Sequence, residues 1–389
     1  MSTASGTRIE NLKQTAGDPS SPEDLLRALQ ETLQSEKDFH RLFDARLIAI
    51  RHRLKIPLAP PTSLENVPAE HEQEFREEYV KAARDVGNLF LQNNQLADAW
   101  AYFRTIGEPE PVREAIDRIN VPREPDQAFD EVMNLALYEG AHIVRGLEFL
   151  LKTHGTCNTV TAFSQLQQQM SNQERRAAAA MMVRTIYTDL QATVRRDVES
   201  RMPVLTPDAS LKDLIAGREW LFAEGNYHID VSHLHSTVGF ARALERDDPE
   251  LPLAIELCEY GLQLAAQLQY PADVPFDEYY TANKHFLSAT AGVQVDEAID
   301  YFRQRLQDEP DEPDQQLIAF VLLDLAERVG RSADVMDVLL PFVSRMEDPN
   351  GFSFTQMCVQ KGMSEQLRQA ALLNDDVLAW SIAQLSDAS

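Results

Sequence analysis

Cysteine is scarce in this sequence of 389 residues, and its three cysteines are widely separated. Cys157, Cys258 and Cys358 lie about a hundred residues apart and form no CxxC pair. A zinc ribbon or a disulfide framework needs closely spaced cysteines, so the sequence supports neither. We expect three free thiols that are buried in a protein of a reducing compartment.

Glycine is also scarce, and the signals of β-structure are missing. The chain has 15 glycines, while leucine, alanine, glutamine, glutamate and arginine are abundant, a composition that favours helices. No segment alternates apolar and polar residues as a half-buried strand does, and no hairpin dipeptide joins two apolar runs. The sequence therefore predicts an all-α fold.

Long apolar runs and an excess of basic residues are missing as well. No run approaches the roughly 18 apolar residues of a membrane span, and the first residues lack the basic start and apolar stretch of a secretory signal. The chain has 62 acidic and 36 basic residues, a net charge of −26, which repels nucleic acid and anionic lipid. We expect a cytoplasmic protein with no nucleic-acid or membrane partner, and a basic partner protein would suit its charge.

The common catalytic and cofactor motifs are absent. The sequence has no GxGxxG, GxxxxGKS/T, HExxH or GxSxG pattern. Each of these motifs places particular side chains or backbone amides around a nucleotide, a metal or a nucleophile. We therefore expect no cofactor, and the absence of these motifs weighs against an enzyme without excluding one.

Four prolines between residues 55 and 68 mark the clearest boundary in the chain. Each proline removes a backbone donor and disfavours helix in the residue before it, so this segment is expected to be extended. Small polar residues before Ser21 predict a disordered tail over 1–20, and Ser21 itself begins a helix-start pattern. We predict an N-terminal helical arm over 21–56, a proline-rich linker over 57–69 and a helical repeat body over 70–389.

Helices and breaks alternate at close intervals along the predicted body. Ser171 and Glu174 form a capping-box pattern at the start of a long helix, and Asp-Pro or Glu-Pro pairs separate several others. Trp100, Trp220 and Trp380 lie within predicted helices, and we expect them in the core or between helices. Pairs of short helices joined by tight turns predict antiparallel helix-hairpin repeats. The expected helices span 70–93, 95–106, 110–118, 125–138, 141–154, 157–169, 172–201, 209–224, 231–246, 250–269, 275–291, 294–308, 313–329, 332–347, 352–360, 363–373 and 375–386.

One segment, residues 83–111, resembles a tetratricopeptide repeat. Gly87, Phe90, Ala99, Phe103 and Pro111 stand at the spacing of that family. Small residues let two antiparallel helices approach closely, the aromatic residues fill the space between them, and the proline ends the second helix.

A second segment, residues 282–310, is similar to the same repeat at fewer positions. Ala298, Phe302 and Pro310 are in register, but Phe286 replaces the expected glycine and Ala289 the expected aromatic residue. The resemblance implies a right-handed α-α superhelix of stacked helix pairs, whose concave face binds a peptide or a partner protein. It implies no catalytic activity, and stability would be a sum of contacts between neighbouring repeats.

The sequence from 224 to 235 is the strongest candidate for a metal or ligand site. His228, Asp230 and His233 combine imidazole and carboxylate groups, which suit zinc or a similar divalent ion. His235 lies on another side of the helix from His233 and is not expected to share the site. The alternative is a junction between two helices, in which Asp230 caps the start of the second helix and needs no metal.

Two classes of function remain open from sequence. The first is a non-enzymatic interaction or scaffold module, which binds a protein or peptide partner in a groove of the helical repeat. The second is an enzyme or a small-ligand or metal-binding protein with a polar pocket around His228, Asp230 and His233. The sequence specifies neither the partner nor the oligomeric state.

Overall fold

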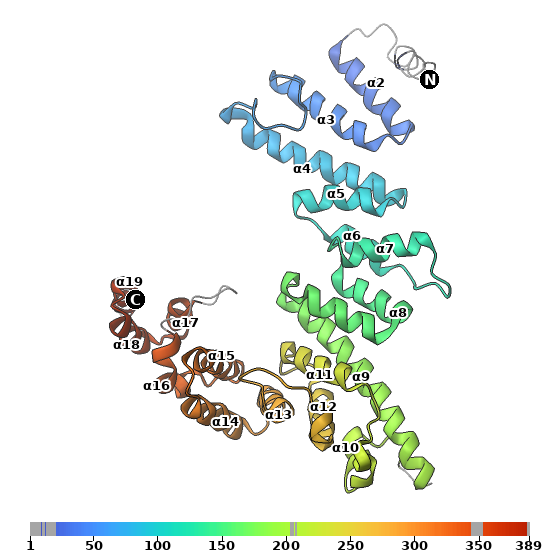
Figure 1. The fold of residues 1–389 in the computed structure, drawn as a ribbon. Coiled ribbons are helices and arrows are strands. Elements are labelled where there is room, and N and C mark those ends of the chain that lie inside the picture. Colours follow the sequence, from blue (N-terminus) through green and yellow to red (C-terminus); the bar gives the residue numbers. More distant parts are fainter. Residues whose placement is uncertain are drawn as a thin grey trace. The chain divides into compact units, whose positions relative to one another are not determined.

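The chain forms two compact units, Met1–Gly155 and Thr156–Ser389, in a computed structural model that describes residues 9, 12, 21–202, 206, 208–343 and 353–386 (Figure 1). Every regular element within these ranges is a helix. Most successive helices pack against each other, and the short loops between them give antiparallel pairs. The all-α helical-repeat fold predicted from sequence is confirmed. The predicted tail over 1–20, apart from residues 9 and 12, and the predicted helical residues 344–347 and 352 lie outside the described residues.

The first unit is a series of helices, most of which pack on the next one along the chain. Its described helices are α2 (Pro22–Ser35), α3 (Phe39–Leu54), α4 (Ala69–Gln92), α5 (Leu96–Ile106), α6 (Glu110–Asp117), α7 (Gln127–Leu137) and the first part of α8 (Ile143–Leu166). Ser21 caps α2 by accepting a hydrogen bond from the Asp24 backbone, as its pattern predicts. Gly155 interrupts α8 with φ 78° and ψ −178°, and the sequence predicts a helix break at this position.

Arg51 ties down the proline-rich segment between α3 and α4. Its fully buried side chain donates hydrogen bonds to the carbonyl oxygens of Pro57 and Pro61, each at 2.8 Å, and of Ser63. The guanidinium carbon also lies 4.8 Å from the centre of the Phe75 ring on α4. Residues 57–68 are therefore a loop anchored within the first unit, and α3 packs directly on α4.

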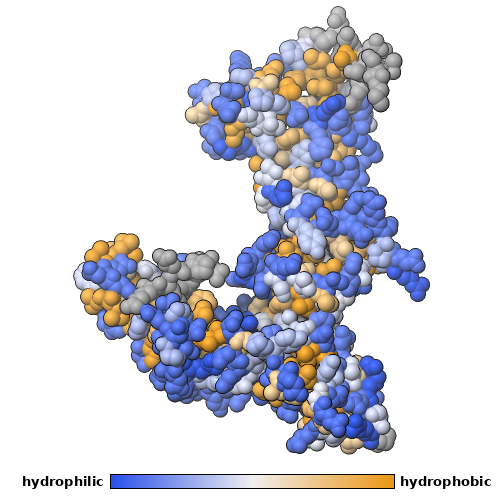
Figure 2. Space-filling view, viewed as in Figure 1, coloured by the Kyte–Doolittle hydropathy of each residue, from blue (hydrophilic) through white to orange (hydrophobic). Residues whose placement is uncertain are grey.

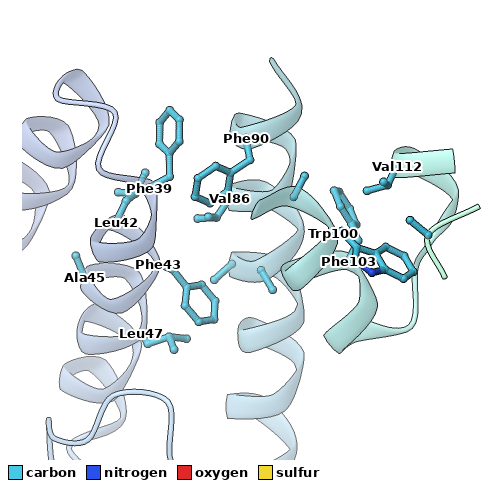
Figure 3. Packing of buried hydrophobic residues seen from close by; sticks show 14 of the residues in the cluster. Phe39, Leu42, Phe43, Ala45, Leu47, Val86, Phe90, Trp100, Phe103 and Val112 are labelled. Carbon is cyan, nitrogen blue, oxygen red and sulfur yellow. The ribbon is translucent and has the colours of Figure 1, made fainter. Parts of the chain in front are cut away.

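The core of the first unit contains aromatic residues from three consecutive helices (Figure 3). Phe39 on α3 meets Phe90 on α4 edge to face, with ring centres 5.2 Å apart. A Cβ atom on Gly87 would lie 2.7 Å from the ring of the fully buried Phe103 on α5. Glycine at 87 therefore permits the close approach of α4 and α5, which is the role that the repeat resemblance gives it.

The second unit continues the same construction over more helices. Ser171 and Glu174 form the predicted capping box at the start of α9. Its described elements after α8 are η1 (Gln167–Gln169), α9 (Asn172–Arg201), α10 (Leu211–Ile215), η2 (Glu219–Gly225), α11 (Val231–Phe240), η3 (Ala241–Ala243), α12 (Leu251–Gln263), η4 (Ala266–Leu268), α13 (Tyr279–Thr290), α14 (Val295–Asp308), α15 (Glu312–Arg328), α16 (Ser332–Val343), α17 (Phe354–Lys361), α18 (Ser364–Asn374) and α19 (Val377–Ser386).

Several details of the second unit differ from the expectations. The helix expected over 209–224 is instead the short α10 followed by η2, and the helix expected from 275 begins at Tyr279. Gly261 on α12 touches Tyr280 on α13, where an added Cβ would lie 2.3 Å from the ring. A glycine–aromatic contact thus occurs here too, outside the second repeat-like segment.

The cysteines and the helix lengths bear on two further expectations. Cys258 and Cys358 are buried, but Cys157 is exposed, so its predicted burial is wrong. Position 157 follows the break in α8 at Gly155 and is exposed to solvent.

No helix in the described ranges combines the length and the apolar character needed to cross a membrane.

Candidate functional site

His228 belongs to a closed hydrogen-bond network between the 226–230 loop, α9 and α12. Its side chain is 5% exposed, and its Nε2 lies 3.1 Å from Asp197 Oδ2. Its Nδ1 lies 3.0 Å from the hydroxyl of Tyr260, which also accepts a hydrogen bond from the His228 backbone. If Nε2 donates to Asp197 and Tyr260 donates to Nδ1, every polar atom is satisfied. Both ring nitrogens are then occupied, and neither is left for a metal.

Asp230 caps α11, as the helix-junction alternative expects. Its Oδ1 accepts hydrogen bonds from the Ser232 backbone at 2.9 Å and from the Ser232 hydroxyl at 2.6 Å. These bonds, with the nearby His233, hold the pKa of Asp230 below its ordinary value despite partial burial. Across the described ranges, histidine, cysteine, aspartate and glutamate side chains form no group of three or more that could hold a metal ion. His228 is thus bonded to Asp197 and Tyr260, whereas Asp230 caps α11 with His233 nearby.

His235, which the sequence separates from the candidate site, lines an open cavity of about 560 Å³ in the second unit. Its ring stacks on Tyr279 with centres 3.7 Å apart, and the Tyr279 hydroxyl donates to the His235 carbonyl oxygen. Burial and the neighbouring Arg242 lower the pKa of His235, so the ring is neutral at neutral pH. Its Nδ1 is buried and has no hydrogen-bond partner in the described part of the chain.

Arg242 supplies a positive charge to the same cavity. Its guanidinium carbon lies 4.1 Å from the centre of the Phe276 ring, and its Nε donates to the Gly239 carbonyl oxygen at 3.1 Å. Burial lowers the pKa of Arg242. Glu245, three residues after Arg242, could pair with it on a continuous helix. However, α11 ends before this position, and Glu245 pairs with Arg176 instead. None of the ion pairs among the described residues includes Arg242.

The last helix pair exposes a group of large apolar side chains, which we call the C-terminal apolar face. Its members are between 43% and 76% exposed and lie on both sides of the turn between α18 and α19: Leu372, Leu373, Val377, Leu378 and Trp380. In Figure 2 the last two helices show apolar surface at this end of the unit. The expectation that Trp380 lies in the core or between helices is wrong, because the inner side of α19 is formed by Ala379 and Ala383.

Comparison with known proteins adds no relative. The chain matches no protein family model, and neither a curated protein nor a solved structure matches it. The cavity at Arg242 and the C-terminal apolar face are therefore the two features that bear on function. The sequence carried a signal for the C-terminal apolar face, since Leu372–Leu373 and Val377–Leu378 are apolar doublets that one helix face cannot fully bury. No local pattern indicates the cavity, whose lining comes from segments far apart in sequence.

Proposed function

We propose that this chain is a non-enzymatic, tetratricopeptide-like interaction module that binds an amphipathic helix of a partner protein on its C-terminal apolar face. The observation that carries the proposal is the exposure of five large apolar side chains on one helix pair. Large contiguous apolar patches are uncommon on monomeric proteins and mark interaction sites. The glycine–aromatic contact between Gly87 and Phe103 supports the family resemblance, and the cytoplasmic location remains a prediction.

The proposed occupant is a helix because the face is the outer side of a helix pair. Within this unit, neighbouring helices pack their apolar sides against each other. A partner helix with apolar residues at spacings of three and four would extend the same packing by one more layer. Trp380 and the leucines are of the residue types that fill interface cores.

Charge favours a basic partner over a second copy of this chain. Asp375 and Asp376 border the face at the turn between α18 and α19, and the whole chain carries a net charge of −26. A second copy would bring the same negative charge, whereas lysine or arginine beside the apolar stripe of a partner helix would be attracted.

A photocrosslinking residue at position 378 tests the occupant directly. We expect crosslinks to a helical segment of another protein that has an apolar stripe flanked by basic residues. The identified segment would then be titrated with purified wild-type chain and with the double variant Leu373→Ser, Leu378→Ser. Loss of two buried leucine contacts should weaken binding by about a hundredfold.

Val293→Ser provides a matched control, because Val293 is an exposed apolar residue outside the face, between α13 and α14. It should bind the segment as tightly as the wild type. Equal binding by the double serine variant would refute the proposal. If position 378 instead crosslinks two copies of the chain, and light scattering shows a dimer that the double variant abolishes, the face mediates self-association. That result would refute the proposed partner helix.

A further inference from the structure

We propose that the cavity beside Arg242 binds a carboxylate group that is attached to an apolar or aromatic body. The cavity shares no residue with the C-terminal apolar face, so this site stands independently of the proposed partner helix. The ligand is defined by its chemistry, and its carboxylate could belong to a small molecule, to a peptide terminus or to an acidic side chain.

Arg242 is the residue on which the proposal depends. Its Nε donates to the Gly239 carbonyl oxygen, but among the described residues its two Nη nitrogens have no hydrogen-bond acceptor and no carboxylate pairs with them. The buried guanidinium of Arg51, by contrast, donates to three carbonyl oxygens. A partly buried guanidinium without a counter-ion is costly, and a bound carboxylate would accept two parallel hydrogen bonds from its fork.

The surroundings of Arg242 hold it in position for such a ligand. Its stacking on Phe276 fixes one side of the guanidinium plane, and Gly239 leaves room for its terminal nitrogen, which would lie 3.2 Å from an added Cβ. The buried Nδ1 of His235 has no partner. An unsatisfied donor costs more than an unsatisfied acceptor, so the ring proton belongs on Nε2, and His235 lines the same cavity as Arg242.

The remaining walls explain why the ligand also needs an apolar part. Phe240 from the end of α11 and Leu317 and Phe320 from α15 line the cavity, and Leu317 is 50% exposed. The volume of about 560 Å³ lies within the usual range for small-ligand pockets. A carboxylate suits the site better than a phosphate, because Arg242 is the one cationic side chain among the described lining residues and Asp273 also lines the cavity.

Titration calorimetry with phenylacetate, phenylacetamide and phenyl phosphate tests the chemical class. We expect the wild-type chain to bind phenylacetate, and to bind the amide and the phosphate ester at least about tenfold more weakly, as expected for a charge-assisted hydrogen bond. The Arg242→Gln variant should bind phenylacetate about tenfold more weakly than the wild type. Arg246→Gln is the control, because Arg246 is exposed and does not line the cavity.

Two further measurements keep the test decisive. If Arg242→Gln unfolds, Arg242→Lys can be used instead. It retains the positive charge but lacks the paired Nη donors, so it should bind phenylacetate more weakly than the wild type. In the wild type, phenylacetate should shift the ring nitrogen resonances of His235. Equal binding of acid and amide, tighter binding of phenyl phosphate, or unchanged binding by Arg242→Gln would overturn the proposal.

Two phenylalanine peptides then identify the source of the carboxylate. One peptide ends in a free carboxylate, and the other has an amidated end and an internal aspartate. Binding of the first indicates a peptide terminus, binding of the second indicates an acidic side chain, and binding of phenylacetate alone indicates a small molecule.

Discussion

Gly87→Ala should destabilise the first unit, although alanine is the better helix former. The added Cβ would lie 2.7, 3.0 and 3.1 Å from three ring atoms of Phe103, whereas carbon atoms prefer about 3.5–4.0 Å. Phe103 is fully buried and cannot move away freely. Overpacking of this kind costs about 1–3 kcal/mol, and the helix gains about 0.5–1 kcal/mol from losing the glycine. We expect a net loss of about 1–2 kcal/mol.

Trp100 offers a local reporter for this measurement. It lies on α5 in the same hydrophobic cluster as Phe103, while Trp220 and Trp380 lie in the second unit. In a background with both of those tryptophans changed to phenylalanine, urea unfolding of the full chain can be followed by Trp100 fluorescence. The expected loss lowers the urea midpoint by about 0.5–1 M, given a typical urea slope.

The ring contact itself is tested by a double-mutant cycle with Phe103→Leu. Removing the ring creates space, so Gly87→Ala should be neutral or slightly stabilising in the Phe103→Leu background. An equal loss in both backgrounds would show that the ring contact is not the cause. A raised midpoint for Gly87→Ala in the wild-type background would refute the close-approach argument altogether.

Two more substitutions have defined outcomes. Arg51→Met removes three donors from the loop over 57–63, so we expect a loss of about 2–4 kcal/mol and faster protease cleavage of that loop, while an unchanged cleavage rate would contradict the anchoring. Asp230→Ala removes the α11 cap and should cost about 1 kcal/mol. The pKa of Asp230 is lower in the folded chain. The wild type should therefore exceed the variant in stability by the full amount above the unfolded pKa of about 3.9, and this difference should vanish as pH falls through the lower folded pKa. Thermal melts from neutral pH to the lowest pH at which the chain stays folded would measure it, and a difference that does not shrink on acidification would count against the cap.

The helices could be predicted because their starts and breaks are local. Ser21 and Ser171 cap helices through hydrogen bonds to nearby residues, and the break at Gly155 needs a glycine because its φ is positive. The proline-rich segment was also identified as non-helical. The anchoring of this segment to the first unit could not be predicted, because Arg51 looks in sequence like one of several basic residues on a solvated helix.

The site was less predictable, because it depends on packing between distant segments. Histidine and aspartate at 228 and 230 suggested a ligand set, yet the partners of His228 are Asp197 and Tyr260, about thirty residues away on either side. The cavity at His235 and Arg242 forms only when α11 meets the loop before α13 and α15. Hydrophobic periodicity locates a helix but does not specify which apolar positions a neighbour will cover.

The C-terminal apolar face and the acidity of the chain together determine how the purified protein responds to salt. At low ionic strength, repulsion between chains of charge −26 keeps two such faces apart. At about 1 M salt the screening length falls to about 3 Å, and sulfate additionally strengthens apolar association. Colloidal stability is therefore greatest in dilute buffer, and precipitation by ammonium sulfate should begin through this face.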